Sequence, residues 1–289
     1  MIKTILVPAM GNQTDSANLA AALQVARSFA AHLDVLHVQL DTVEVAVAMA
    51  ADIGGGGILS SGLIEQLERE VREREARAHR VFSEFCAHDG LAIIASPVEG
   101  RLQPSAQWHV ETGQEPRWMA AYGTTADLIV ASRGSGDDFT LRSILEAVLL
   151  ETGRPLLIPS AAAPAVMMAE KIAIAWKATA EAARAVALAM PFLTRTKEIA
   201  VMTVEEEEGR RDDADRLVRS LAWHGLSATV ERLTPGAHGA AETLLAAVAN
   251  KAGLLIMGGY GHNRLREWVF GGFTQRILAD APLPVLIAH

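Results

Sequence analysis

Gly253-Leu254-Leu255-Ile256-Met257-Gly258-Gly259-Tyr260-Gly261, with Gly271-Gly272-Phe273-Thr274 following ten residues after the last of these glycines, is the stretch of sequence that decides the fold. The apolar run predicts a buried strand, and the residues after Thr274 follow a helical pattern. Glycines let a chain turn sharply, and they have no side chain to cover the backbone N–H groups. Two glycine clusters near the carboxyl end of one strand are the usual setting for a phosphate in an open α/β sheet. The stretch therefore indicates a nucleotide.

Composition and charge exclude several classes of protein. The chain has 289 residues, of which 50% are hydrophobic, and a formal net charge of -8. A nonspecific nucleic-acid binder needs a basic face to displace counterions, so we expect no nucleic-acid partner. The apolar stretch from Val43 to Ile64 is broken by Asp52 and by Gly54 to Gly57, and the N-terminus lacks the features of a signal peptide. We therefore expect a cytoplasmic protein that does not enter a membrane.

Neither a metal centre nor an enzyme active site is identified by the residue pattern. The nine histidines show no HxxxH or HExxH spacing, and Cys86 is the single cysteine, in a helical pattern where a small buried residue is expected. A phosphate-binding G-x-x-x-x-G-K-[ST] loop, a nucleophile elbow and a G-x-G-x-x-G after the first strand are all missing from the sequence. We therefore predict no catalytic residue and do not expect an enzyme, although the sequence leaves the question open.

The same order of elements occurs twice along the chain. Each copy begins with a short apolar strand and an alanine-rich helix, and the order of the later elements also agrees. The predicted strands lie at residues 3–8, 33–38, 92–95, 126–131 and 154–158 in the first copy, and at 171–176, 198–204, 228–231, 253–258 and 283–287 in the second.

Strands that alternate with helices imply parallel sheets covered by helices on both faces. The low-complexity run from Ser160 to Ala165 is the natural linker between the copies. We therefore predict two domains, at residues 1–160 and 169–289. An insertion from about Val43 to Gly62 occurs only in the first copy, and we interpret it as a loop, with a lid over a ligand as the alternative.

The pattern Gly258-x-x-Gly261-x9-Gly271-Gly272, in a unit that ends in Pro284-Val285-Leu286-Ile287, resembles the universal stress protein family. The resemblance covers nearly the whole chain. It implies an α/β fold of two tandem Rossmann-like domains, each a five-stranded parallel sheet of strand order 3-2-1-4-5 with helices on both faces. In one branch of the family it also implies ATP, or another adenine nucleotide, at the ends of the first and fourth strands, and a bound nucleotide could bring magnesium with it.

Carried over residue by residue, the resemblance implies one site in the second domain. The glycines and the start of the following helix would cradle the phosphates, and residues on the first two strands would hold adenine and ribose. The implied site residues are Ala175, Trp176, Lys177, Val201, Met257, Gly258, Gly261, Gly271, Gly272, Phe273 and Thr274.

This sequence departs from the family at two of these positions. Lys177 stands where the ATP-binding branch usually has aspartate, and it could instead approach a phosphate as a point charge. Gly272 stands where serine is commoner, which removes a hydroxyl donor but keeps the backbone N–H groups. Trp176 follows the first strand directly, where its ring could lie against an adenine or fill the pocket. His262 and Arg264 lie between the glycines and could approach a phosphate or face water.

The first copy departs further. Its fourth strand ends in Ala131-Ser132-Arg133-Gly134, which keeps one glycine, and Asp137 and Asp138 add negative charge nearby. We therefore predict that the first domain lacks the phosphate cradle and pairs with the second domain within the chain. The resemblance leaves a homodimer open as well.

Two functions remain open at this point. One is a regulatory, stress-response protein that binds an adenine nucleotide in its second domain. The other is a scaffold without nucleotide, whose glycines serve tight turns and close packing and whose surface binds protein partners of unknown identity. Slow ATP hydrolysis is the least favoured function, because no general base is identified near the glycines.

Overall fold

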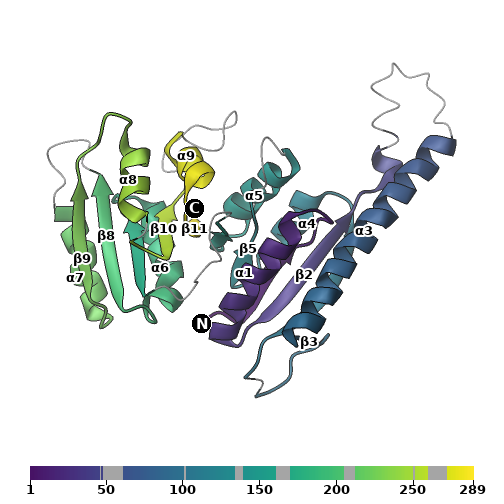
Figure 1. Cartoon of the computed structure of the whole chain (residues 1–289), viewed down its shortest axis with the longest axis horizontal. Coiled ribbons are helices and arrows are strands. Elements are labelled where there is room, and N and C mark those ends of the chain that lie inside the picture. The colour runs from purple at the N-terminus through teal and green to yellow at the C-terminus, as the bar shows by residue number, and fades with distance from the viewer. Residues whose placement is uncertain are drawn as a thin grey trace.

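The computed structural model describes residues 1–45, 47, 61–100, 102–133, 139–160, 170–204, 212–249, 251–259 and 272–289. Within these ranges one eleven-stranded sheet runs through the molecule with helices on both of its faces (Figure 1). The strand order is β3-β4-β2-β1-β5-β6-β11-β10-β7-β8-β9, so the strands of the two copies occupy the two halves of the sheet.

The second half has the expected sheet of five parallel strands. Read from its outer edge, the order β9-β8-β7-β10-β11 is the predicted order 3-2-1-4-5. Its strands are β7 (Lys171–Ala175), β8 (Glu198–Val204), β9 (Ala228–Leu233), β10 (Leu254–Gly258) and β11 (Val285–Ala288). Its helices are α6 (Ala180–Leu193), α7 (Asp212–Trp223), α8 (Ala240–Val248) and α9 (Gly272–Asp280).

The first half has the same order with one strand added at its edge. Its strands are β1 (Thr4–Pro8), β2 (His32–Gln39), β3 (Ala92–Ile93), β4 (Ser105–Thr112), β5 (Leu128–Val130) and β6 (Leu156–Ile158). Its helices, among the described residues, include α1 (Thr14–Phe29), α3 (Ser61–Asp89), α4 (Glu115–Gly123) and α5 (Phe139–Glu151). The α/β class and its helices on both faces are therefore confirmed, with six strands rather than five in this half.

The strand predicted at residues 92–95 is present as the short β3, but its predicted place next to β2 is wrong. The strand that pairs with β2 is β4, in register from His32↔Ser105 to Gln39↔Thr112, and the short β3 only extends the sheet beyond it. β4 carries polar residues on one face, whereas buried parallel strands are expected to be apolar throughout. The apolar run at residues 92–95 matched that expectation better, although Ile93 is exposed in the structure.

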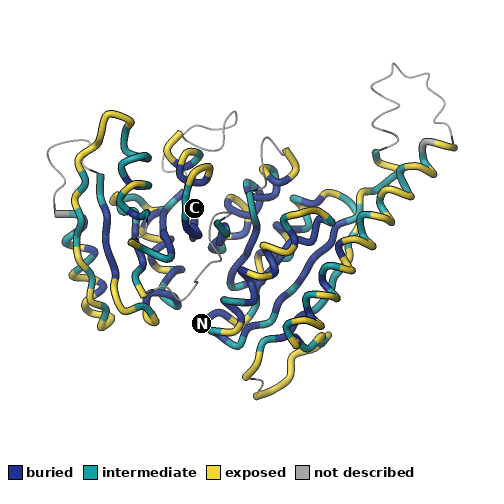
Figure 2. Tube along the Cα trace, viewed as in Figure 1, coloured by how far each residue is buried: buried dark blue, intermediate teal, exposed yellow. Residues whose placement is uncertain are grey.

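Two apolar layers sandwich the sheet. Helices α1, α3, α6 and α7 cover one face, and α4, α5, α8 and α9 cover the other. Figure 2 shows the strands as the buried part of both halves, with the exposed residues on the outer sides of the helices. Each layer continues across the middle of the molecule, so the two halves share their core.

The halves meet through their fifth strands, β6 and β11, which pair antiparallel with Leu157 opposite Leu286. Beside this ladder, the rings of Phe29 and Phe192 meet edge to face at 5.5 Å between centroids. The guanidinium of Arg195 lies 4.2 Å from the centre of the Phe29 ring, a cation–π contact. The expected pairing of the two halves within one chain is therefore present.

Two of the sequence predictions fall on residues that the structure does not describe. The inserted segment from Val43 to Gly62 lies mostly outside the described residues, as does the linker after Ser160. The domain limits at residues 1–160 and 169–289 stay predictions.

Cys86 should be unreactive in the folded protein. It lies on α3 and is 3% exposed, and burial raises the pKa of its thiol to about 11. The thiolate is the reactive form, so at pH 8 about one thiol in a thousand is ionised, and even that fraction is shielded. We expect negligible alkylation by iodoacetamide over an hour at pH 8, and complete alkylation in 8 M urea as the control. Mass spectrometry gives a clear readout because the chain has one cysteine. Rapid alkylation of the native protein would show that this part of α3 opens.

Candidate functional site

The carboxyl ends of β7 and β10 lie side by side in the second half. Ala175, the last residue of β7, pairs with Met257, and Gly258 ends β10. The chain leaves β7 towards β8 on one side and β10 towards β11 on the other, so the strand order reverses between them. Ligands of open α/β sheets bind at such switch points, outside the carboxyl ends of the strands. Three of the predicted site residues are therefore brought to the place where a ligand is expected.

Gly258 is held against the first turn of α6. A Cβ atom at this position would lie 2.7 Å from the carbonyl carbon of Glu181 and closer still to the backbone nitrogen of Ala182. No side chain fits at such a distance from backbone atoms, so the close approach of helix and strand requires glycine. This glycine has a packing role whether or not a nucleotide binds.

The N-terminus of α6 already holds an anion of its own. The hydroxyl oxygen of Thr179 caps the helix by accepting the N–H of Ala182 at 3.3 Å. The pKa of Glu181 is lowered because its carboxylate accepts its own backbone N–H, with further contributions from the Thr179 hydroxyl, Arg184 and His289. The positive end of this helix dipole is thus occupied by a carboxylate, whose negative charge disfavours a second anion at the same place.

The start of α9 offers the second set of backbone N–H groups. Around Gly272 no atom of the described residues lies within 4 Å of the place where a Cβ would be, whereas Thr274 is buried and Phe273 is 39% exposed. The first N–H groups of a helix have no partners within the helix, so this end can receive an anion. Gly261 and Gly271, together with His262 and Arg264, lie outside the described residues.

The residues expected to hold adenine and ribose lie at different depths. The backbone N–H of Trp176 donates to the carbonyl of Met202 at 2.8 Å, which continues the pairing of β7 with β8, and Lys177 is exposed. Val201 is fully buried within β8, opposite Ile174, in the layer beneath α6 and α7. The structure therefore places Trp176 and Lys177 at the carboxyl ends of the strands, where a ligand is expected, and Val201 deeper in the sheet.

Residues that the sequence did not single out also shape this edge. His289 lies beside the end of β10, with its Nδ1 3.2 Å from the carbonyl oxygen of Gly259. Thr179 and Glu181 form the cap of α6. A threonine followed by an acidic residue before an alanine-rich helix is a recognisable capping signal, whereas the position of His289 depends on the pairing of β11.

The equivalent edge of the first half is filled by its own side chains. Asp15 is buried and accepts the N–H groups of Met10 at 2.8 Å and of Gly11 at 2.7 Å. Burial raises the pKa of Asp15, and these backbone donors partly offset that effect. His37 is also buried, and its Nδ1 donates to the carbonyl of Ala9 at 2.7 Å. The loop after β1 is thus held closed by a carboxylate and an imidazole.

Helix α3 closes this edge from outside. Arg74 donates to the carbonyl of Met10 at 2.7 Å and forms an ion pair with Glu115 of α4. A Cβ on Gly11, which has a φ of +69°, would lie 2.6 Å from the carbonyl oxygen of Arg74. The helix backbone therefore packs directly on the loop after β1, where the second half has the turn from Ala175 to Thr179.

Neither a metal site nor a membrane span appears in the part of the chain that the structure describes. Among these residues, no three His, Cys, Asp or Glu side chains come together as ligands. None of the helices in the described ranges combines the length and the apolar character needed to cross a membrane.

Comparison with known proteins agrees with this geometry. Residues 159–289 match the model of the universal stress protein family. The crystal structure of a universal stress protein from Archaeoglobus fulgidus aligns with a TM-score of 0.66 at 15% identity, over 99% of this chain and 95% of that one. A putative universal stress protein from Pseudomonas aeruginosa aligns with a TM-score of 0.57 at 17% identity, over 99% and 93% of the two chains.

A transporter domain has a similar fold. The cytoplasmic domain of a prokaryotic cation chloride cotransporter aligns with a TM-score of 0.50 at 13% identity, over 99% of this chain and 95% of that domain. At such identities the structural matches show the fold alone. No curated protein matches the chain.

Proposed function

Since residues 159–289 match the model of the universal stress protein family, we propose that the second half of this chain binds an adenine nucleotide and that the protein acts as a regulator in the stress response. One observation carries the proposal. The ends of β7 and β10 lie side by side, and the glycine pattern begins there at Gly258 and continues into α9. The backbone N–H groups there are the kind of donor that phosphates take.

The residues present fit such a ligand. Gly258, Gly261, Gly271 and Gly272 would supply backbone N–H groups to the phosphates, together with Phe273 and Thr274 at the start of α9. The open space around Gly272 leaves room for a phosphate oxygen at the end of the helix. Magnesium would come with the nucleotide.

Adenine and ribose would lie towards β8. Ala175, Trp176 and Lys177 form the turn beside them, and Met257 and Val201 support that turn from the two faces of the sheet. No residue in this set is placed as a general base, so the proposed activity is binding rather than hydrolysis.

Calorimetric titration with ATP, ADP and AMP tests the proposal. We expect saturable heat with one nucleotide per chain and a rise in the melting temperature, because a ligand that binds the folded state stabilises it. The first-half edge is filled, so a stoichiometry of two would contradict the assignment to one half. No heat and no thermal shift at millimolar nucleotide would eliminate nucleotide binding altogether.

A serine introduced at Gly272 sharpens this test. The side chain fits without contacts and adds a hydroxyl donor, so Gly272→Ser should bind ATP about tenfold more tightly, the effect of one hydrogen bond to a charged group. Gly62→Ser is the matched control, since Gly62 on α3 has equally open surroundings and should leave the affinity unchanged. Lys177→Asp tests whether Lys177 contacts the phosphates or the adenine side. A loss of affinity for ATP without a loss of affinity for AMP would assign this lysine to the phosphates.

The alternative function is a scaffold without nucleotide. The packing of Gly258 against α6 favours it, because that contact explains one glycine of the pattern with no ligand. The same fold occurs in the cytoplasmic domain of a prokaryotic cation chloride cotransporter. Nucleotide recovered from the purified protein would contradict the scaffold. A homodimer in either case would need a surface other than the fifth strands, which already pair within the chain.

A further inference from the structure

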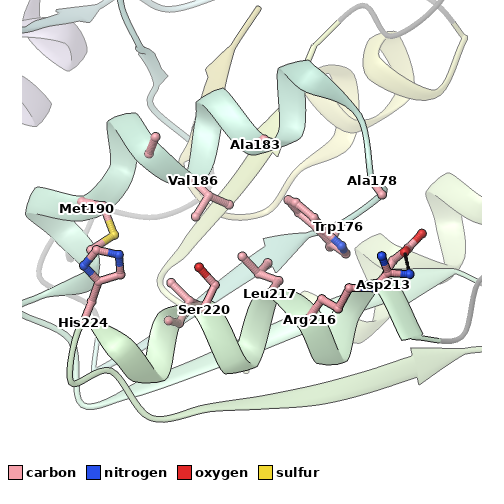
Figure 3. A pocket seen from close by; sticks show the side chains of 12 residues that line it. Trp176, Ala178, Ala183, Val186, Met190, Asp213, Arg216, Leu217, Ser220 and His224 are labelled. Atoms are coloured by element: carbon pink, nitrogen blue, oxygen red, sulfur yellow. Dashed lines mark ion pairs between the residues drawn. The ribbon is translucent and has the colours of Figure 1, made fainter.

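A groove runs between α6 and α7 on one face of the second half (Figure 3). Its volume is about 540 Å³, within the range of small-molecule sites. The middle of the groove is mostly apolar, with Val186 on one wall and Leu217 on the other, and Ser220 is the polar residue beside Leu217. Polar groups lie towards the ends, with His224 at one end and the Arg216–Asp213 ion pair at the other. The site is therefore elongated, with an apolar body between polar ends.

The corresponding helix of the first half, α3, carries larger side chains at two of the positions that line the groove. Helices α3 and α7 end alike, because Leu91 donates to the carbonyl of Cys86 as Leu226 donates to that of Leu221. Both helices are followed by a glycine of positive φ, Gly90 at +63° and Gly225 at +74°. This pairing places the residues of the two helices in correspondence.

Aromatic residues of the first half are replaced by smaller ones in the second. When the ends of α3 and α7 are aligned, Phe82 corresponds to Leu217 and Phe85 to Ser220. Phe82 is fully buried and meets the ring of Trp108 at 5.3 Å between centroids. The groove of the second half is thus lined by smaller side chains than those at the corresponding positions of the first half.

Trp176 presents an unused donor to this groove. Its indole Nε1 is buried and has no hydrogen-bond partner among the residues that the structure describes. Figure 3 shows the ring at the end of the groove that Asp213 and Arg216 form. A buried N–H without a partner is unfavourable, so an acceptor that reached it would bind favourably.

The ion pair at this end of the groove can rearrange at low cost. Arg216 is 68% exposed and pairs with Asp213 at 3.1 Å, as residues three apart on one helix do. Exposed pairs of this kind contribute little to stability, so the arginine side chain can turn outward at low cost. The rest of the groove needs no rearrangement to accept an apolar chain.

We propose that this groove binds one uncharged, elongated molecule with an apolar chain of about ten carbons and an oxygen acceptor at one end, as in a medium-chain alcohol. The acceptor receives the Nε1–H of Trp176, and the chain lies between Val186 and Leu217 towards His224. From Asp213 to His224 the helix rises about 16 Å at 1.5 Å per residue, which suits such a chain. The ligand is uncharged because Arg216 is already balanced by Asp213. Trp176 also belongs to the proposed nucleotide site, but the groove lies between α6 and α7 and binds its ligand without nucleotide.

Binding of 1-decanol to the full chain tests the proposal, with calorimetry for affinity and ¹⁵N NMR of the indole N–H groups for position. The chain has five tryptophans, and the signal lost in Trp176→Phe identifies Trp176. We expect that signal to move downfield on addition of 1-decanol. Trp176→Phe keeps a ring but removes the donor, and it should weaken binding about tenfold. Absence of binding, or a shift confined to the other four indoles, would overturn the proposal.

Two further variants complete the design. Trp223→Phe is the matched control, the same change on α7 at a side chain that is 91% exposed, and it should leave the affinity for 1-decanol unchanged. Ser220→Phe restores the aromatic residue of the first half and should abolish binding while circular dichroism shows a folded protein. Binding that survives Ser220→Phe would place the ligand outside the groove. Decanoate should bind more weakly than 1-decanol, and the opposite order would overturn the uncharged assignment.

Discussion

Replacing Gly258 with alanine is expected to lower the free energy of unfolding by about 3 kcal/mol. The added Cβ would meet the backbone of Glu181 and Ala182 in the first turn of α6, and backbone atoms cannot turn aside as a flexible side chain can. Strand β10 and helix α6 would have to separate, which disturbs the layer that both share with β7. Urea unfolding followed by circular dichroism measures the loss.

Gly272→Ala is the matched control for this substitution. Gly272 begins α9, and in the described part of the chain no atom lies within 4 Å of its missing Cβ. Alanine costs less conformational entropy than glycine in a helix, so this variant should be as stable as the native chain or slightly more stable. Equal stabilities for the two variants would show that the first turn of α6 yields to the new methyl group.

A carboxylate at Leu157 is expected to destabilise the protein by about 4 kcal/mol, because it would bury a charge without a partner. Leu157 is fully buried on β6, opposite Leu286 of β11, in the apolar layer that both halves share. Since β6 has only three residues, Leu157→Asp leaves little of the ladder intact. We expect a lower urea midpoint and separate transitions for the two halves.

Leu150→Asp provides the comparison for Leu157→Asp. It makes the same chemical change on α5, at a side chain that is 45% exposed, and should cost less than about 1 kcal/mol. If Leu157→Asp unfolds in one transition at the native midpoint, the junction contributes little and the halves are stable by themselves.

The sequence predicted most of the strands because burial on both faces makes them apolar. β7, β8, β10 and β11 all follow such runs, and their order agrees with the prediction. β4 was missed because one of its faces carries polar residues such as Gln107 and His109, so its pattern is unlike that of a buried parallel strand.

The candidate site was predictable only in part. The glycines and the strand ends could be found because both are local features of the sequence. The contact between Gly258 and α6, and the closure of the first-half edge by Asp15 and Arg74, depend on segments far apart in the chain. The α6–α7 groove also escaped prediction, since it results from small residues that become apparent only when the two helices are compared residue by residue.

The closed edge of the first half makes the pair of domains asymmetric. Two equivalent sites on a symmetric dimer can influence each other, so that the first ligand changes the affinity for the second. Here Asp15, Arg74 and the backbone of α3 occupy one of the two positions. A ligand that binds at the strand ends of the second half therefore meets one site per chain, and its saturation curve should be hyperbolic, with a Hill coefficient of about one.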